Sequence, residues 1–442
     1  MKPIYIAINI IAFIIATSII LTVPIIYAPF FILVSLYTAY NLTLFFYSFK
    51  YKYIITPKQK LIESPSVAIL YMTCNDFNKQ SIDSIKNLSY QNKSIYIVDD
   101  SSKPEYKEAI DNIDGVTIIR RDNREGFKAG SINNALKQIT ADYISICDSD
   151  ELVPIDYIER SLEYFTDNSI AFVQASHYAY NKHNNWTIAM GNGIDLHWTT
   201  YQKYRNNGIV VNFLGHGAIL KTSVIREVGG MPLLVSEDIA LTVEIYKAGY
   251  KGVFADSVQV GEATPETYSQ FKRRHKKWSM GAMEFLKKYL IKIITSKNLS
   301  VSQKEDLVLS TLSLPLSALF ILFIIGTFFI PIKATIPLIA LSALAILSPQ
   351  LVFFKLKGIK NILKSIIINA IAFMSLLPTS LIYTIKGSIS PTFLITNQKA
   401  NRSHIDYIPD MTVGAGLILI GGLISPLAIV ALCSPIWYKI WN

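Results

Sequence analysis

The sequence predicts an α/β domain built on a parallel sheet and inserted between helical membrane segments. Three observations predict this architecture. No charged residue occurs from Ile4 to Phe49, and a membrane-spanning helix needs about 20 apolar residues. Short β-rich runs alternate with helical patterns from 65 to 175, as parallel strands joined by crossover helices do. Apolar runs then return at 307–330, 334–354, 365–385 and 412–436.

The N-terminal apolar stretch is long enough for two spans, with a break expected between Pro24 and Pro29. A cleaved signal peptide is the alternative, but the run is too long and lacks a polar cleavage region. Lysines flank this stretch and crowd a later turn: Lys2, Lys50, Lys52, Lys355, Lys357, Lys360 and Lys364. Because cytoplasmic loops carry an excess of Lys and Arg, we expect a multi-pass plasma-membrane protein with a cytoplasmic α/β domain.

Composition divides the chain of 442 residues into four parts. These are an N-terminal transmembrane hairpin (1–52), a cytosolic α/β domain (53–270), basic amphipathic interfacial helices (271–304) and a C-terminal transmembrane block (305–442). The three cysteines, Cys74, Cys147 and Cys433, indicate neither a disulfide framework nor a zinc site. The six histidines show no spacing typical of metal ligands.

Five runs in the α/β domain predict strands: 66–72, 94–100, 116–120, 142–150 and 170–175. Three intervening segments predict helices: 79–88, 104–112 and 128–138. In such sheets ligands bind beyond the carboxyl ends of the strands. The residues that follow each strand are therefore the first place to look for chemistry.

Two of these strands end in acidic residues. Asp99 and Asp100 follow one strand, and Asp148, Asp150 and Glu151 follow another. Carboxylates crowded together repel one another unless a positive charge lies between them. Mg2+ or Mn2+ bound to a diphosphate would supply that charge, so we expect the acids near 99 and 148 to share a divalent ion. The alternative for each pair is an ordinary turn or helix cap.

Three more stretches carry candidate functional residues. "GFKAGSINNAL" (126–136) places Lys128 at a loop-to-helix junction, where helix N-termini favour phosphate. Glu237 and Asp238 precede an amphipathic helix, and capping by Ser236 or by the acids is the alternative. The stretch 270–292 is a basic helix with an apolar side, which is also typical of a helix on an anionic membrane surface.

Taken in order, these pieces resemble glycosyltransferase family 2, and within it the membrane-integrated processive synthases of cellulose, chitin and hyaluronan. The matching motifs are "DDSS" (99–102), "DSD" (148–150), "SED" (236–238) and "RHKKW" (274–278), together with "GFKAGSINNA" and "FLGHGAILK" (213–221). The last catalytic motif departs from the family, because Lys277 stands where Arg is usual. Lys keeps the charge but loses the planar fork that grips phosphate.

The resemblance implies a GT-A (Rossmann-like) cytosolic domain and an inverting, metal-dependent hexosyltransferase. It would use a UDP-sugar to elongate and export a β-linked polysaccharide, with a cellulose-like β-glucan favoured. The alternative is a non-processive transferase that adds a single sugar to a lipid or polyprenyl phosphate. A transporter or receptor with a non-catalytic domain is a third class, which the acidic strand ends argue against. Implied partners are the donor, the growing polysaccharide or lipid acceptor, the lipid bilayer, and a second copy or accessory subunit; nucleic acid is not expected.

The resemblance also implies roles for individual residues. Asp238 would be the general base, with Glu237 beside it, and Asp150 and Asp148 would hold Mg2+ or Mn2+. Donor contacts would come from Thr73, Asn75, Asp99, Asp100, Lys128, Asp148, Arg274 and Lys277. Acceptor contacts would come from Trp278, Gly215 and His216.

The segment 386–402 resembles the cytosolic gating loop of cellulose-synthase-like enzymes. Phe393 and Thr396 match its motif, and Lys399 falls one residue late. The match implies that 365–385 lies along the membrane surface, which its polar content favours, whereas hydropathy alone predicts a sixth span.

Overall fold

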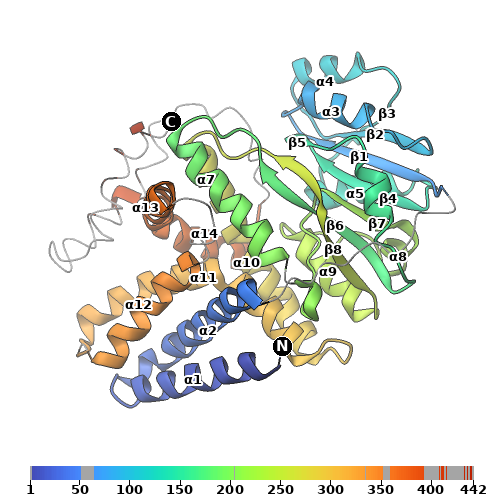
Figure 1. Cartoon of the computed structure of the whole chain (residues 1–442). Helices are drawn as coiled ribbons and strands as arrows, with labels where there is room; N and C mark the ends of the chain where they lie inside the picture. Colours follow the sequence, from blue (N-terminus) through green and yellow to red (C-terminus); the bar gives the residue numbers. More distant parts are fainter. Residues whose placement is uncertain are drawn as a thin grey trace.

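The computed structural model describes residues 2–50, residues 64–351 apart from 204 and 334, residues 359–392, and scattered positions from 408 to 440. The sheet and its helices occupy one end of the molecule, and long helices from both ends of the chain occupy the other (Figure 1). Among these helices, α2 (Ala28–Lys50) packs against α1 (Lys2–Ile20), α11 (Val301–Phe329) and α12 (Ile336–Leu351). Segments from opposite ends of the sequence therefore form one helical unit.

The five predicted strands of the α/β domain are confirmed. They are β1 (Val67–Thr73), β2 (Lys93–Asp99), β3 (Thr117–Ile119), β4 (Tyr143–Asp148) and β6 (Ile170–Ala179). The predicted helices are confirmed as α3 (Lys79–Lys86), α4 (Pro104–Asp111) and α5 (Phe127–Leu136). Strands β3, β2, β1 and β4 are neighbours in this order and parallel, as the alternating pattern predicts.

Three further strands were not predicted, and together with β6 they make the sheet mixed and GT-A-like. It adds β7 (Ala218–Lys221), β8 (Lys251–Glu262) and the short β5 (Glu151–Leu152), in the full order β3-β2-β1-β4-β7-β6-β8-β5. Strand β7 runs antiparallel to both β4 and β6. The sequence of β8 includes Gly252, Asp256 and Ser257, and glycine and aspartate are depleted in strands.

Alternating side chains of β1 feed two cores on opposite faces of the sheet. Ala68, Leu70 and Met72 join the core that includes α5, whereas Val67, Ile69 and Tyr71 join the core that includes α3. This is the period of two that a strand imposes on its side chains. Helices on both faces bury the parallel strands, so that only their ends are available to a ligand.

The remaining helices before α11 are α6 (Tyr157–Leu162), α7 (Asn185–Leu196), α8 (Thr222–Glu227), α9 (Glu237–Lys247) and α10 (Tyr268–Thr295). The π-turn His197–Gln202 and the short helix Arg205–Asn207 follow α7. Arg205 joins the domain to the long apolar helices, because its guanidinium lies 2.5 Å from Asp306 of α11. Tyr40 of α2 donates to the same carboxylate across 2.9 Å.

Two described helices are long and apolar enough to cross a membrane, over Ile25–Phe46 and Val301–Thr327. The predicted break in the N-terminal stretch is present as Pro24 and the short helix Ile25–Tyr27. The apolar part of α1 is shorter, at Ala7–Ile20. The predicted span 412–436 lies almost wholly outside the described residues.

The predicted segment 365–385 forms two helices, α13 (Ile359–Ser375) and α14 (Leu377–Ile389), bent by 51° at the break between them. Its polar residues contact the α/β domain: Asn369 donates to the Ala189 carbonyl of α7, and Ser375 bonds the Tyr268 hydroxyl of α10. These contacts explain the polar content of an otherwise apolar stretch. Phe393, Thr396 and Lys399 lie outside the described residues.

Candidate active site

The carboxyl ends of three strands meet at one edge of the sheet. In the register of β1, Thr73 lies opposite Asp99 of β2, and Met72 lies opposite Asp148 of β4. A cavity of about 660 Å³ opens here and is lined by Thr73, Asp100, Asp148 and Asp150, among others. Both acidic strand ends therefore border one cleft, as expected, with β1 between them.

The positive charges beside Asp99 and Asp100 come from the protein itself. Arg120 lies 2.7 Å from Asp99 Oδ2, and the other oxygen of Asp99 accepts a hydrogen bond from the Ser101 amide. Arg121 donates hydrogen bonds to both carboxylate oxygens of Asp100, from Nε to Oδ1 at 2.8 Å and from Nη2 to Oδ2 at 2.6 Å. These arginines follow β3, next to β2. The expectation that the acids near 99 and 148 share one divalent ion is therefore corrected, since the first pair is already neutralised.

Asn75 lies in the loop after β1 and supports the loop after β2. Its side-chain oxygen accepts hydrogen bonds from the backbone amides of Ser102 and Lys103, each at 2.9 Å. Its backbone is left-handed, with φ of 60°. The adjacent Asp76 was not predicted as a site residue, but it lines the cavity and accepts a hydrogen bond from Thr73.

Lys128 bridges the two sides of the cavity. Its ammonium lies 2.5 Å from Asp148 Oδ1 and donates to the Gly215 carbonyl across 2.9 Å. Burial alone would lower the pKa of Lys128, but the carboxylates of Asp148 and Glu237 raise it above its ordinary value. Lys128 is thus a fixed cation where the sequence predicts a phosphate contact.

Glu237 and Asp238 begin α9 and face the same cavity. Ser236 makes no side-chain capping bond to this helix. Burial raises the pKa of Glu237 to about 7, and it also raises the pKa of Asp238 above its ordinary value. A Cβ placed on Gly215 would lie 3.5 Å from Asp238 Oδ2. The carboxylate of Asp238 is therefore next to the 213–221 segment.

Helix α10 brings Arg274, Lys277 and Trp278 to the cavity wall. The Arg274 guanidinium lies 4.7 Å from the centre of the Trp278 ring and 3.8 Å from a Glu262 oxygen. Burial lowers the pKa of Lys277, which the Glu237 carboxylate partly offsets. Trp278 keeps 42% of its surface exposed, so an aromatic face remains available.

The same helix also holds the "SED" segment in place. A Cβ on Gly281 would lie only 2.3 Å from Ser236 Oγ. Glu284, buried one turn further on, accepts a hydrogen bond from the Val235 amide across 2.9 Å. Neither residue was predicted from the sequence, because their role depends on the packing of α10 against α9.

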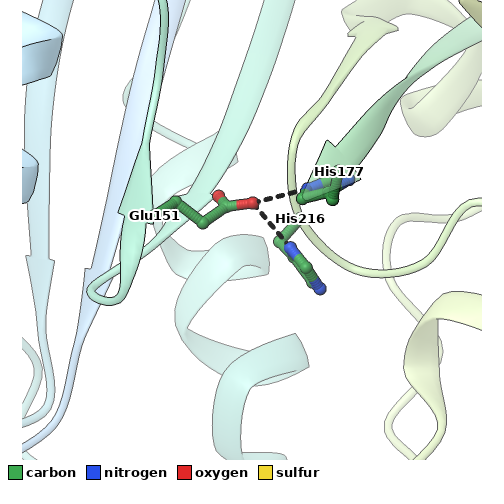
Figure 2. A group of neighbouring side chains, drawn as sticks. All are labelled: Glu151, His177 and His216. Atoms are coloured by element: carbon green, nitrogen blue, oxygen red, sulfur yellow. Dashed lines mark hydrogen bonds and ion pairs between the residues drawn. The ribbon is translucent and has the colours of Figure 1, made fainter. Parts of the chain in front are cut away.

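A third unpredicted group is Glu151, buried between His177 and His216 (Figure 2). One carboxylate oxygen lies 2.8 Å from His177 Nε2 and 2.6 Å from His216 Nδ1. Burial alone would lower the pKa of His216, but Glu151 raises it to about 10. The sequence signal was present, since Glu151 extends the acidic run after β4, but the histidines lie far away in the chain.

The cavity continues past the "SED" segment to the apolar helices α11 and α13. Ser310, Ser313 and Leu314 of α11 line it, as do Asn369 and Phe373 of α13. The predicted donor residues and the apolar helices therefore share one continuous space.

The site thus combines a GT-A-like α/β sheet with acids, a fixed lysine and a buried carboxylate pair around one cleft. Residues 143–356 match the family model described as Glycosyl transferase family group 2. This match and the relatives described next support a family 2 glycosyltransferase of the synthase-like type.

Two curated plant relatives illustrate this similarity. Glucomannan 4-beta-mannosyltransferase 9 of Arabidopsis thaliana is 28% identical over 231 residues, which cover 49% of this chain and 43% of the relative. Glucomannan 4-beta-mannosyltransferase 1 of Oryza sativa subsp. japonica is 27% identical over 226 residues, with 48% and 43% covered. The match thus spans less than half the length of these relatives.

Solved structures with a related arrangement were also found. Mannosyltransferase PcManGT from Pyrobaculum calidifontis, in complex with GDP-Man and Mn2+, has a TM-score of 0.48 and 16% identity, with 83% of this chain and 98% of that chain covered. S. aureus TarS 1-349 in complex with UDP-GlcNAc has a TM-score of 0.39 and 13% identity, with 73% and 89% covered.

Proposed function

We propose that this protein is an inverting membrane glycosyltransferase that elongates and exports a β-linked polysaccharide from a nucleotide sugar. One observation carries the proposal: the cavity that holds Lys128, Asp148 and Asp238 is continuous with surfaces of α11 and α13. A growing chain that leaves such a site meets membrane helices directly. The names of the plant relatives add mannan and glucomannan to the cellulose-like glucan that the motifs favour.

The donor diphosphate fits the sheet edge of the cavity. Asp150 and Asp148 would hold Mg2+ or Mn2+, since their oxygens are the hard ligands that these ions prefer. Asp148 Oδ1 is bonded to Lys128, and its side chain keeps 32% of its surface exposed. A bound ion would neutralise charge that develops on the leaving diphosphate. Lys128, Arg274 and Lys277 are the protein cations for the same diphosphate.

Thr73 and Asp100 would contact the nucleoside. Asp99 and Asn75 would support these two residues indirectly, because their side-chain oxygens accept hydrogen bonds from Arg120 and from the loop backbone. Our proposed division of the chain keeps the sheet domain at 53–270 and the two membrane parts at 1–52 and 305–442.

The acceptor hydroxyl must lose its proton as it attacks the anomeric carbon. Asp238 would take this proton as general base, and burial favours that role because it raises the pKa of the carboxyl. Glu237 precedes it in the chain and is also buried. Trp278 would stack on the acceptor sugar, whose C–H faces pack well on aromatic rings.

The apolar helices support a location in a membrane. We propose the plasma membrane, with the sheet domain on the cytoplasmic side where nucleotide sugars are made. The lysine-rich flanks support this orientation.

The second candidate is transfer of one sugar to a lipid or polyprenyl phosphate. The apolar residues at the membrane end of the cavity, Leu314 and Phe373, favour it, because they would suit a lipid chain as well as a sugar.

The size of the product separates the two candidates. Purified protein in lipid nanodiscs would be given Mg2+ or Mn2+ and labelled GDP-mannose, UDP-glucose or UDP-GlcNAc. We expect one donor to give a high-mass polymer that a β-glycanase degrades. A single labelled glycolipid would instead establish the second candidate, and no transfer from any donor would reject both.

A further inference from the structure

The buried Glu151 side chain connects three segments that surround the cavity. It extends from β5 toward His177 of β6 and His216 of the loop before β7, which Figure 2 shows converging on one oxygen. Its second oxygen accepts a hydrogen bond from the Asp148 amide across 2.9 Å. One carboxylate thus ties the donor strand end to the loop beside Asp238.

That loop is held from several directions. Gln174 of β6 accepts a hydrogen bond from the Leu214 amide and donates to the His216 carbonyl, each at 2.9 Å. The Gly217 amide donates to Ile146 of β4 across 2.8 Å. A Cβ on Gly217 would lie 2.2 Å from His177 Nε2, so a larger residue would separate the histidine from Glu151.

These contacts also fix the His216 ring. Nδ1 is bonded to Glu151, and Figure 2 shows the other ring nitrogen pointing away from the carboxylate. His216 lines the cavity, whereas the side chains of Glu151 and His177 are wholly buried. Its neighbour Gly215 is the residue whose Cβ would lie 3.5 Å from Asp238.

We propose that Glu151, supported by His177, is a positioning residue that holds His216 Nε2 against a hydroxyl of the acceptor sugar beside Asp238. The inference rests on the proposed function, since it needs a sugar acceptor. It extends that function by assigning a purpose to two buried residues that touch no substrate. His177 acts only through Glu151, because Trp198 stacks on its ring at 4.0 Å and covers it.

A metal ion is the other reading of this cluster, since the three ligand atoms lie within 4.8 Å of one another. The separations of 2.6 and 2.8 Å are those of hydrogen bonds. Two ligands about 2.1 Å from one tetrahedral ion would lie roughly 3.4 Å apart. The distances therefore favour direct contact.

A double-mutant cycle tests the inference in nanodiscs. The variants are Glu151→Gln, His216→Gln and the double variant, with Asp83→Asn as a carboxyl-to-amide control on exposed α3. The probes are GDP-mannose with β-1,4-linked mannotetraose, and UDP-glucose with cellotetraose. We expect each single variant to raise the acceptor KM about tenfold, as loss of one charged hydrogen bond does. The acceptor KM of the double variant should not exceed that of His216→Gln by more than twofold. The Kd for the nucleotide should change by less than twofold in every variant.

Three results would overturn the inference. The first is a double variant whose change in acceptor KM equals the product of the two single changes, or a fall in nucleotide affinity that accompanies the change in KM. Either result would indicate a structural role for Glu151. The second is stoichiometric Co2+ or Zn2+ binding that His177→Gln abolishes. The third comes from the binding of the oligosaccharides measured without a donor. This measurement tests the role of His216 even if no sugar is transferred and the proposed function fails. Equal binding by wild type and His216→Gln, or binding by neither, would refute the role of His216.

Discussion

Lys128 lies 2.5 Å from Asp148 and donates to the Gly215 carbonyl across 2.9 Å. A single ammonium group thus joins the acidic end of β4 to the loop beside Asp238. This contact fixes Asp148 relative to the Gly215 loop across the cavity, and the first prediction concerns its loss.

Replacing Lys128 by Met should lower kcat/KM for sugar transfer by about 10²–10³-fold. That is the usual cost of removing one preorganised group from developing negative charge, and here Asp148 also loses its partner. Steady-state release of nucleotide measures the effect. Lys137→Met, at the exposed end of the same helix, is the control and should keep full activity. A Lys128→Met enzyme with more than half of the normal rate would contradict the assigned role.

Removal of divalent ions should stop transfer. Asp148 and Asp150 line the part of the cavity where we propose that the donor diphosphate binds, and carboxylate oxygens are the ligands that Mg2+ and Mn2+ prefer. Product formation would be followed in excess EDTA and after Mg2+ or Mn2+ is added back. Sugar transfer at the full rate in EDTA would show that the reaction does not need a divalent ion.

Glu237 should make folding stability depend on pH. Burial raises its pKa to about 7 from an ordinary 4.5. The protonated side chain therefore contributes fully to the free energy of unfolding below pH 4.5, and this contribution is lost as the pH rises through 7. The loss is on the order of 3 kcal/mol. Glu237→Gln removes this ionisation. The melting temperature of the variant minus that of the wild type should therefore increase from pH 5 to pH 8.

Thermal unfolding in detergent measures that difference. Glu108→Gln, which changes an exposed glutamate of α4, should track the wild type at every pH. A constant gap between Glu237→Gln and wild type across this range would mean that Glu237 titrates normally.

Helix α14 should tolerate no side chain at Gly387. A Cβ there would lie 2.4 Å from the Met280 carbonyl oxygen and 2.8 Å from its Cα in α10. Because backbone atoms cannot rotate away, Gly387→Ala should destabilise the protein by about 1–3 kcal/mol. Gly193→Ala in α7 is the matched control, since its Cβ would lie at an ordinary contact distance of 3.6 Å from the side-chain oxygen of Asn369. Equal melting temperatures for the two variants would show that α14 is not pressed against α10.

The parallel half of the sheet could be predicted because its strands are buried and separated by amphipathic helices. The runs at 66–72 and 94–100 coincide with β1 and β2 within a residue or two. Strands β7 and β5 are too short to give a pattern. Strand β8 contains polar and small residues, which obscure the alternation.

The site was predictable where a residue and its neighbours in sequence carry the chemistry. Asp148, Glu237 and Asp238 meet in one cavity as the motifs imply. The partners of the acids were not predictable, because they come from other strands. Arg120 and Arg121 lie on the far side of a crossover helix from Asp99 in sequence, yet they are next to it in the sheet.

The most direct test of the central claim is sugar transfer by Asp238→Asn, with nucleotide binding measured on the same preparation. Asparagine keeps the shape of the side chain but cannot accept the proton of the attacking hydroxyl. We predict that transfer falls by about 10²–10⁴-fold, while metal-dependent nucleotide binding stays within twofold of wild type. Retained turnover in this variant would contradict the assignment of Asp238 as the base.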